Sequence, residues 1–178
     1  LTPPFSKDCV IAKFYRPGRW SKETILEEHQ FLLELTELEI PVVAPLIIDN
    51  QTLFTCPTTN FLYALFPKMR GRLKDELNKE EITIIGRLAA RIHNAGSNSS
   101  FSHRPLFHPM NYIDTHFEHL KKNTELPGHT VNNYLTLAKE MSTQIKPLFD
   151  SLKNQRIHGD LHRGNIIWSS DGPYIVDL

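Results

Sequence analysis

Short apolar runs, separated by turn-forming residues, fill the first third of the chain and predict β-strands. The run CVIAKFY at residues 9–15 is rich in β-branched and aromatic residues, which favour a strand. Three more runs also predict strands: VVAPLII (42–48), TLFTC (52–56) and FLYALF (61–66). Between the first two runs, the spacing predicts a helix that Ser21 caps, that extends to about Glu39 and that Pro41 ends. We therefore expect a small antiparallel sheet with one inserted helix.

From Pro67 onward, the apolar spacing follows the helical period. Asn78 is a suitable N-cap for a helix with acidic residues in its first turn, and Gly96 stands where that helix should stop. The apolar stripe of this helix consists of Ile82, Ile85, Ala89 and Ile92. Two more helices are expected at about 111–122 and 130–152. The pattern predicts an α+β fold with two lobes, a sheet-rich lobe at residues 1–66 and a helical lobe at residues 67–178.

Composition narrows the class of protein without naming a function. Of 178 residues, 40% are hydrophobic and 22% are charged, which is an ordinary globular balance. Twenty basic and twenty acidic side chains give no net charge, so no electrostatic argument favours a nucleic-acid partner. Two cysteines fit a reducing compartment, and the sequence shows no membrane-span or signal-peptide pattern. We expect a monomeric cytoplasmic protein that binds neither nucleic acid nor a membrane.

The closing stretch, RIHGDLHRGNIIWSSDGPYIVDL, combines two short apolar runs with residues that handle metals and protons. The runs IIW and YIV predict a hairpin, because the Asp-Gly pair between them favours a turn. Pairing of Trp168 with Tyr174 would set the register of this hairpin. In that register, Asn165 lies opposite Asp177, roughly 4.5–5.5 Å away at Cα. An amide oxygen and a carboxylate at this separation suit Mg²⁺, which takes few protein ligands and leaves room for phosphate.

Asp160 precedes Asn165 by five residues, in a loop with two glycines, and is a candidate base for a hydroxyl proton. An Asp, an Asn five residues later and a second Asp after a hairpin form the catalytic and metal-binding arrangement of protein kinases. That arrangement also needs a lysine on an early strand and a glutamate on the next helix. Lys13 lies in an apolar strand and Glu28 in an apolar helical stripe, although the period leaves Glu27 open as the partner. These residues favour a phosphotransferase.

The same motifs resemble those of a known family. The segments IHGDLHRGNIIW and YIVDL are similar to the H-G-D-x-x-x-x-N and apolar-Asp motifs of the aminoglycoside phosphotransferase and choline kinase group, a branch of the protein-kinase-like fold. The pieces AKFYRPGRW, ILEEHQF and VVAP, with the FP near the lobe junction, look closer still to the bacterial stress response kinases of that group. The resemblance extends over essentially the whole chain.

The resemblance implies a role for each matched position. Asp160 matches the catalytic base, while Asn165 and Asp177 match the Mg²⁺ ligands. Lys13 matches the lysine that binds the phosphates of ATP, and Glu28 matches the glutamate that orients this lysine. The implied cofactors are therefore ATP and Mg²⁺.

The resemblance also implies where the adenine and the acceptor bind. The adenine is expected against backbone groups of the segment that links the lobes, near Leu65, Phe66 and Lys68. The stress response kinases phosphorylate protein Ser/Thr, whereas the wider group modifies small alcohols such as aminoglycosides, choline or homoserine. Only twelve residues precede Lys13 and the chain stops at Leu178, so we expect a fold truncated at both ends.

Two other hypotheses remain open at this point. The sequence HGDLH could serve a metal-dependent hydrolase that uses His158, Asp160 and His162. That hypothesis leaves Lys13 and Glu28 without a role. Alternatively, the chain could be a kinase-like fragment that binds a nucleotide or a partner without catalysis.

Overall fold

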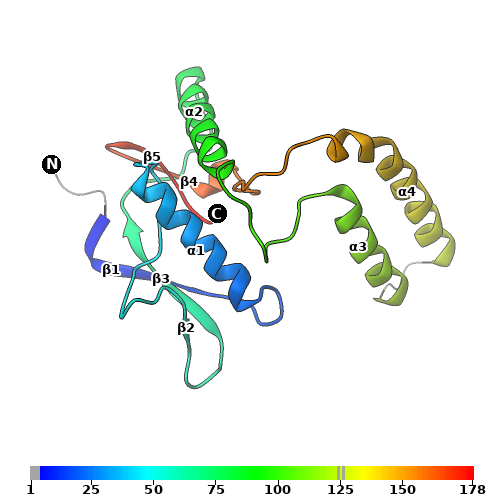
Figure 1. Ribbon diagram of the computed structural model, residues 1–178, viewed down its shortest axis with the longest axis horizontal. Helices are drawn as coiled ribbons and strands as arrows, with labels where there is room; N and C mark the ends of the chain where they lie inside the picture. Colours follow the sequence, from blue (N-terminus) through cyan, green and yellow to red (C-terminus); the bar gives the residue numbers. More distant parts are fainter. Residues whose placement is uncertain (1–4, 124, 126) are drawn as a thin grey trace. The chain divides into compact units, whose positions relative to one another are not determined.

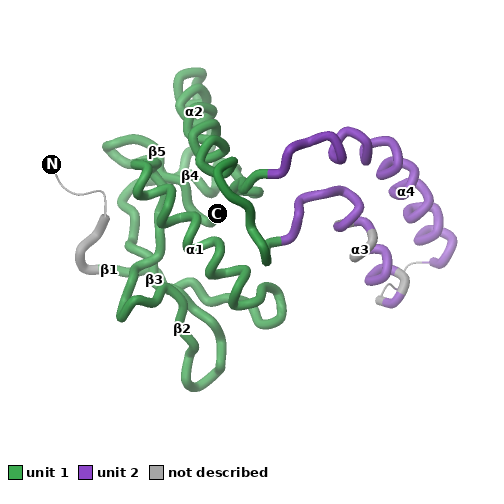
Figure 2. The backbone as a smooth tube through the Cα atoms, in the orientation of Figure 1, with its two compact units in different colours: residues 1–104, 155–178 green, residues 105–154 purple. Residues whose placement is uncertain are grey.

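The computed structural model describes residues 5–123, 125 and 127–178. The chain divides into two compact units, shown in separate colours in Figure 2. The first unit comprises Leu1–Arg104 and Gln155–Leu178, and the second comprises Pro105–Asn154. The lobe boundary expected between Phe66 and Pro67 falls inside the first unit and stays a prediction.

A three-stranded antiparallel sheet forms the early part of the first unit (Figure 1), in agreement with the sequence. It consists of β1 (Phe5–Phe14), β2 (Phe54–Thr55) and β3 (Leu62–Met69), in the order β1-β3-β2. Strand β3 lies in the middle and continues through Phe66 and Pro67 to Met69. Its register with β1 places Lys13 opposite Ala64, so Lys13 lies next to the central strand.

The run at 42–48, expected to be a strand, forms only isolated bridges. One of them joins Val42 to Ile175 in parallel. Pro41 and Pro45 lack the N–H groups that a regular ladder needs, and this explains why no strand forms. Two backbone bonds still connect the segment to the C-terminal hairpin: the Ile175 amide donates to the Pro41 carbonyl at 2.9 Å, and the Val43 amide donates to the Ile175 carbonyl at 3.0 Å.

Helix α1 (Lys22–Glu37) begins where the sequence predicts, because the Ser21 hydroxyl accepts a hydrogen bond from the Thr24 amide at 3.2 Å. It ends slightly before the expected residue. Glu39 has a left-handed backbone with φ 55°, and the Ile40 amide then donates to the Leu35 carbonyl at 2.9 Å.

Helix α2 (Lys79–Gly96) has a capping box at its start, because Asn78 and Glu81 each accept a hydrogen bond from the other's amide. Its expected stripe is only partly buried: Ile92 is buried, but Ile82 is 58% exposed. The N-terminal turns of α2 extend beyond the elements that the helix packs against, as Figure 1 shows. Gly96 is the last helical residue and does not adopt the left-handed conformation of a typical C-terminal stop. It instead lets the backbone of Arg156 come close to the helix.

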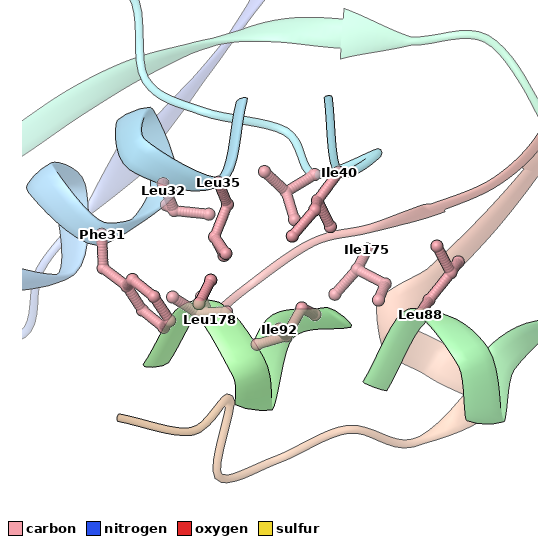
Figure 3. Packing of buried hydrophobic residues seen from close by; sticks show 10 residues of the cluster. Phe31, Leu32, Leu35, Ile40, Leu88, Ile92, Ile175 and Leu178 are labelled. Carbon is pink, nitrogen blue, oxygen red and sulfur yellow. The ribbon is translucent and has the colours of Figure 1, made fainter. Parts of the chain in front are cut away.

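The main apolar core lies between α1, α2 and the end of the chain (Figure 3). The C-terminal hairpin consists of β4 (Ile166–Ser169) and β5 (Gly172–Ile175). Ile175 of β5 and Leu178 both pack in this cluster. The cluster consists of Phe31, Leu32, Leu35, Ile40, Val42, Leu88, Ile92, Ala95, Ile175 and Leu178. This core therefore fixes α1, which carries Glu28, against the segment that carries Asp177.

The second unit contains helices α3 (Pro109–Asn123) and α4 (Gly128–Asp150), close to the two helices that the sequence predicts. The ring of His108 packs edge-on against Phe149 at 5.8 Å between centroids, and its Nε2 lies 3.3 Å from the Asp150 carboxylate. Within the described part of the chain, no helix is long and apolar enough to cross a membrane.

Candidate active site

The C-terminal hairpin forms as expected, but its register differs by one residue from the prediction. Trp168 pairs with Pro173, not with Tyr174, and Ser169 pairs with Gly172. The turn is therefore a tight two-residue turn. Gly172 adopts φ 114°, and the Ser169 hydroxyl accepts from the Asp171 amide while donating to the Gly172 carbonyl. The sequence did not reveal that the Ser169 side chain would close the turn. This closure leaves a shorter loop than the sequence predicts.

The corrected register changes the neighbour of Asn165. Its carbonyl accepts a hydrogen bond from the Val176 amide at 3.0 Å, so Val176 faces Asn165, and Asp177 follows one residue later. Asp177 lies beyond β5 and has a left-handed backbone with φ 58°. The expected direct pairing of Asn165 with Asp177 is wrong. Asn165 instead bonds to Val176, and Asp177 is the next residue in the chain.

The loop before the hairpin is organised by a buried histidine. His158 is 5% exposed; its Nδ1 accepts from the Asp160 amide at 3.3 Å, so its Nε2–H donates to the Val176 carbonyl at 3.1 Å. Burial lowers the pKa of His158, which favours this neutral form. The Asn165 amide nitrogen donates to the Asp160 carbonyl at 3.0 Å. The Asp160 carboxylate itself is 73% exposed and accessible to another molecule.

The two histidines of the hydrolase hypothesis do not converge on one point. Both ring nitrogens of His158 bond to backbone groups, so neither has a lone pair available for a metal. His162 is largely exposed; its Nδ1 accepts from the Gly164 amide at 3.0 Å, and its Nε2 lies 3.7 Å from Asp160. This geometry does not favour metal-assisted hydrolysis through His158, Asp160 and His162.

Lys13 lies between two carboxylates. Its Nζ is 3.3 Å from Glu28 Oε1 and also forms an ion pair with Asp177. Glu27, the alternative partner, instead accepts from the backbone amides of residues 102–104. Of the two glutamates that the sequence left open, Glu28 is therefore the one that pairs with Lys13.

Arg104 is a site residue that the sequence analysis missed. Its Nη1 lies 2.7 Å from Glu28 Oε2, so Glu28 has two cationic partners. The two residues are 76 positions apart, and no local pattern connects them. Only the tertiary fold brings Arg104 to Glu28, in the N-terminal half of α1.

A cavity of about 350 Å³ lies beside these charges. Its polar lining consists of Lys13, Glu28 and Asp177. Its apolar lining consists of Ile11, Leu32, Val43, Phe66, Pro67, Met69, Ile167, Val176 and Leu178. Phe66 lies at the position expected for the adenine segment, whereas Lys68 is exposed and does not line the cavity. An apolar space of this kind can hold a flat ring, and Lys13, beside its two carboxylate partners, is the cationic lining residue for an attached anion.

The donor set also fits a hard divalent cation. The amide nitrogen of Asn165 is committed to the Asp160 carbonyl, which leaves the amide oxygen as the atom that can face a cation. The Asp177 carboxylate is 57% exposed and lines the cavity. Neither Asn165 nor Asp160 lines the cavity, so of these three residues only Asp177 borders it. One carboxylate and one amide oxygen are hard oxygen ligands of the kind that Mg²⁺ takes from a protein.

Comparison with curated proteins finds bacterial kinases. The chain is 36% identical over 169 residues to stress response kinase A of Escherichia coli strain K12, covering 94% of this chain and 51% of that protein. It is 35% identical over the same length to the serine/threonine protein kinase RdoA of Salmonella typhimurium strain LT2. The chain therefore spans about half the length of the curated relatives that it matches.

Two solved structures share the fold. An amicoumacin kinase in complex with AMP-PNP, Ca²⁺ and Ami matches 95% of this chain and 51% of its own, with a TM-score of 0.71 and 19% identity. An AMP-bound spectinomycin phosphotransferase matches with a TM-score of 0.50 and 13% identity. These likenesses confirm the expected α+β, protein-kinase-like fold. The model of the phosphotransferase enzyme family matches residues 6–178, and the chain belongs to this family.

Proposed function

We propose that the protein is an ATP- and Mg²⁺-dependent phosphotransferase, most closely of the serine/threonine protein kinase type. The observation that carries the proposal is the cavity whose polar wall consists of Lys13, Glu28 and Asp177. These residues come from β1, from α1 and from beyond β5, and no short segment of sequence contains all three. A nucleotide-binding kinase needs this combination.

The nucleotide would use both parts of the cavity. Its adenine would lie against the apolar lining near Phe66, with backbone groups of the 65–68 segment as hydrogen-bond partners. Its phosphates would bind the Lys13 ammonium, which Glu28 orients. The Leu65 carbonyl already accepts from the Leu46 amide at 2.7 Å, so other backbone groups of this segment would bind the adenine.

Asn165 and Asp177 would hold Mg²⁺ through their side-chain oxygens. When bound, the ion would neutralise phosphate charge and help to align the transferred group. Asn165 is positioned for this by its bond to the Asp160 carbonyl. Asp177 is positioned by the backbone on both sides, because Val176 bonds to Asn165 and Leu178 is buried in the core.

Asp160 would accept the proton of the acceptor hydroxyl. The hydroxyl oxygen then forms a bond to the γ-phosphorus, and the bond between that phosphorus and the β–γ bridging oxygen breaks to release ADP. The exposed carboxylate of Asp160 suits a base that must meet a separate acceptor molecule.

The acceptor is proposed from the relatives. The two curated relatives at 35–36% identity are named as a stress response kinase and as a serine/threonine protein kinase. The solved antibiotic kinases are more distant, at 13–19% identity. We therefore place protein Ser/Thr first and small alcohols second. The cytoplasmic location and the monomeric state expected from the sequence stay predictions.

The decisive experiment measures phosphate transfer from radiolabelled ATP by the complete natural protein that carries this chain. Casein serves as the protein acceptor, and kanamycin and choline serve as small alcohols. Asp160→Asn should lower kcat about 10²–10⁴-fold, which is the usual contribution of a general base. Asp171→Asn is the matched control, because Asn-Gly forms the same turn as Asp-Gly. Undiminished transfer by Asp160→Asn would refute the assignment.

A further inference from the structure

Glu28 is bound at both of its oxygens by different cations. Lys13 Nζ lies 3.3 Å from Oε1, and Arg104 Nη1 lies 2.7 Å from Oε2. The Glu28 side chain is only 9% exposed, so water screens these contacts poorly. The shorter contact belongs to Arg104, whose guanidinium therefore holds this carboxylate at least as firmly as Lys13 does.

The guanidinium is itself fixed by its surroundings. The amides of Ser102, His103 and Arg104 donate to Glu27 at 2.6, 2.9 and 2.9 Å. The Thr24 hydroxyl donates to the His103 carbonyl at 3.2 Å, so the segment is attached to α1 at two adjacent turns. The guanidinium also lies 5.5 Å from the centroid of the Phe101 ring. Arg104 thus reaches Glu28 from a segment that is anchored independently of it.

The charges form a continuous chain. From the cavity outward, they run from Asp177 to Lys13, from Lys13 to Glu28 and from Glu28 to Arg104. The four groups together have no net charge. Without Arg104 the side chains sum to −1 before Mg²⁺ binds, because one ammonium then faces two carboxylates. A phosphate site with a net negative charge repels the anion that it has to bind.

We propose that Arg104 is a positioning residue of the phosphate site. It fixes Oε2 of Glu28 so that Oε1 faces Lys13, and it takes up part of the Glu28 charge so that the Lys13 ammonium stays available to phosphate. This inference rests on the proposed function. Arg104 thereby keeps Lys13 and Glu28 paired and prevents a net negative charge among the side chains that would bind ATP.

A purely structural role makes a different prediction. If Arg104 only attached its segment to α1, its effect would not depend on Glu28. Glu27 accepts three backbone hydrogen bonds from the same segment. Loss of these bonds would then change catalysis about as much as loss of Arg104. The two roles are separated by a double-mutant cycle between Arg104 and Glu28.

The test measures the KM for ATP and kcat with the complete natural protein and a saturating acceptor. Arg104→Gln should raise the KM for ATP about tenfold, as expected for loss of a hydrogen bond to a charged group. Arg87→Gln, on the exposed face of α2, is the matched control and should leave the KM unchanged. In the Glu28→Gln background, Arg104→Gln should have little further effect, because the carboxylate through which it acts is gone.

Arg104→Lys keeps the positive charge and gives a second measurement if Arg104→Gln folds poorly. Its KM for ATP should stay within about threefold of the wild-type value, because the charge sum is preserved. A KM raised as far as in Arg104→Gln would overturn the charge-sharing argument. Equal effects of Arg104→Gln with and without Glu28 would also overturn the proposal. A wild-type protein that transfers no phosphate would instead refute the proposed function, so the two failures are distinct.

Discussion

Among the single residues, a buried polar network lies beside Lys13, the proposed phosphate-binding residue. The Tyr15 hydroxyl lies 2.9 Å from His29 Nε2, and His29 Nδ1 lies 2.9 Å from the Thr52 hydroxyl. Burial lowers the pKa of His29 to about 4 and raises the pKa of Tyr15, so both groups stay neutral. The Lys13 ammonium lies 5.3 Å from the centroid of the Tyr15 ring. The network therefore holds an uncharged aromatic wall beside the lysine.

The depressed pKa of His29 predicts how stability depends on pH. The unfolded histidine binds a proton below about pH 6.5, whereas the folded one stays neutral down to about pH 4. The contribution of His29 is therefore fully present above pH 6.5 and is lost as the pH falls from there through 4, by about 3 kcal/mol. Urea unfolding at several pH values should show this decline.

The matched variant for this prediction is His29→Gln, which cannot titrate. Its free energy of unfolding will be lower at pH 7, but it should fall less between pH 6.5 and 4 than that of the wild type. Carboxylates with a lowered pKa, such as Glu27 and Glu81, are common to both proteins and cancel in the difference. Parallel curves for the two proteins would contradict the assignment.

Among the elements, the C-terminal end of α2 packs on the chain just before the loop that carries Asp160. The Arg156 amide donates to the Gly96 carbonyl at 3.2 Å. The Arg156 guanidinium lies 2.6 Å from Glu34 and 4.2 Å from the centroid of the Phe31 ring, which joins this segment to α1. A Cβ on Gly96 would overlap the Arg156 carbonyl oxygen, so a larger residue would push the loop away from the helix.

Gly96→Ala should therefore destabilise the fold by about 2 kcal/mol or more, which is typical of overpacking against backbone. Gly86→Ala is the control. Gly86 lies in the same helix, and its added Cβ would have no atom within 4 Å, so this change should stabilise the protein by about 0.5–1 kcal/mol. Thermal unfolding of both variants measures the difference in their stability. A Gly96→Ala protein as stable as the wild type would contradict a close contact between Gly96 and the Arg156 backbone.

The sequence predicted those features of the elements that depend on local periodicity. The Ser21 and Asn78 caps follow from side-chain chemistry, which is a property of neighbouring residues. The helical period placed Glu28 in an apolar stripe but left Glu27 open as the partner of Lys13, and the tertiary contact decides between them. The hairpin register failed because the Ser169 side chain closes a shorter turn than the Asp-Gly pattern implied. Arg104 could not be found, because its contact with Glu28 is made by tertiary folding.

For the molecule as a whole, the main feature is the cavity that we propose as the nucleotide site. The described residues that line the cavity include those proposed to face the ring and the phosphates and Asp177, one of the two proposed metal ligands. The chain spans about half the length of its curated relatives, and its acceptor is proposed separately from its nucleotide. Nucleotide binding and acceptor recognition can therefore be tested apart.

Binding of Mg·ATP to the 178-residue chain should raise its melting temperature. A ligand that binds only the folded state adds about 2.7 kcal/mol at a concentration of 100 times its Kd. Differential scanning fluorimetry should record this rise in the wild type and a smaller one in Asp177→Asn, with Mg·GTP and Mg²⁺ alone as references. No rise at millimolar nucleotide would indicate the inert kinase-like fragment.

The backbone bonds of residues 41–43 to Ile175 have a mechanical consequence for α1. They hold the chain just after the helix to the hairpin, so any tilt of the helix would turn about a pivot near Glu37. Glu28 lies nine residues from that pivot, or about 14 Å at the rise of an α-helix. A tilt of about 10° would then move Glu28 by about 2 Å, enough to break its 3.3 Å contact with Lys13. The residue 102–104 segment binds Glu27, next to Glu28, and Thr24 in the first turn of α1, and these contacts resist the tilt.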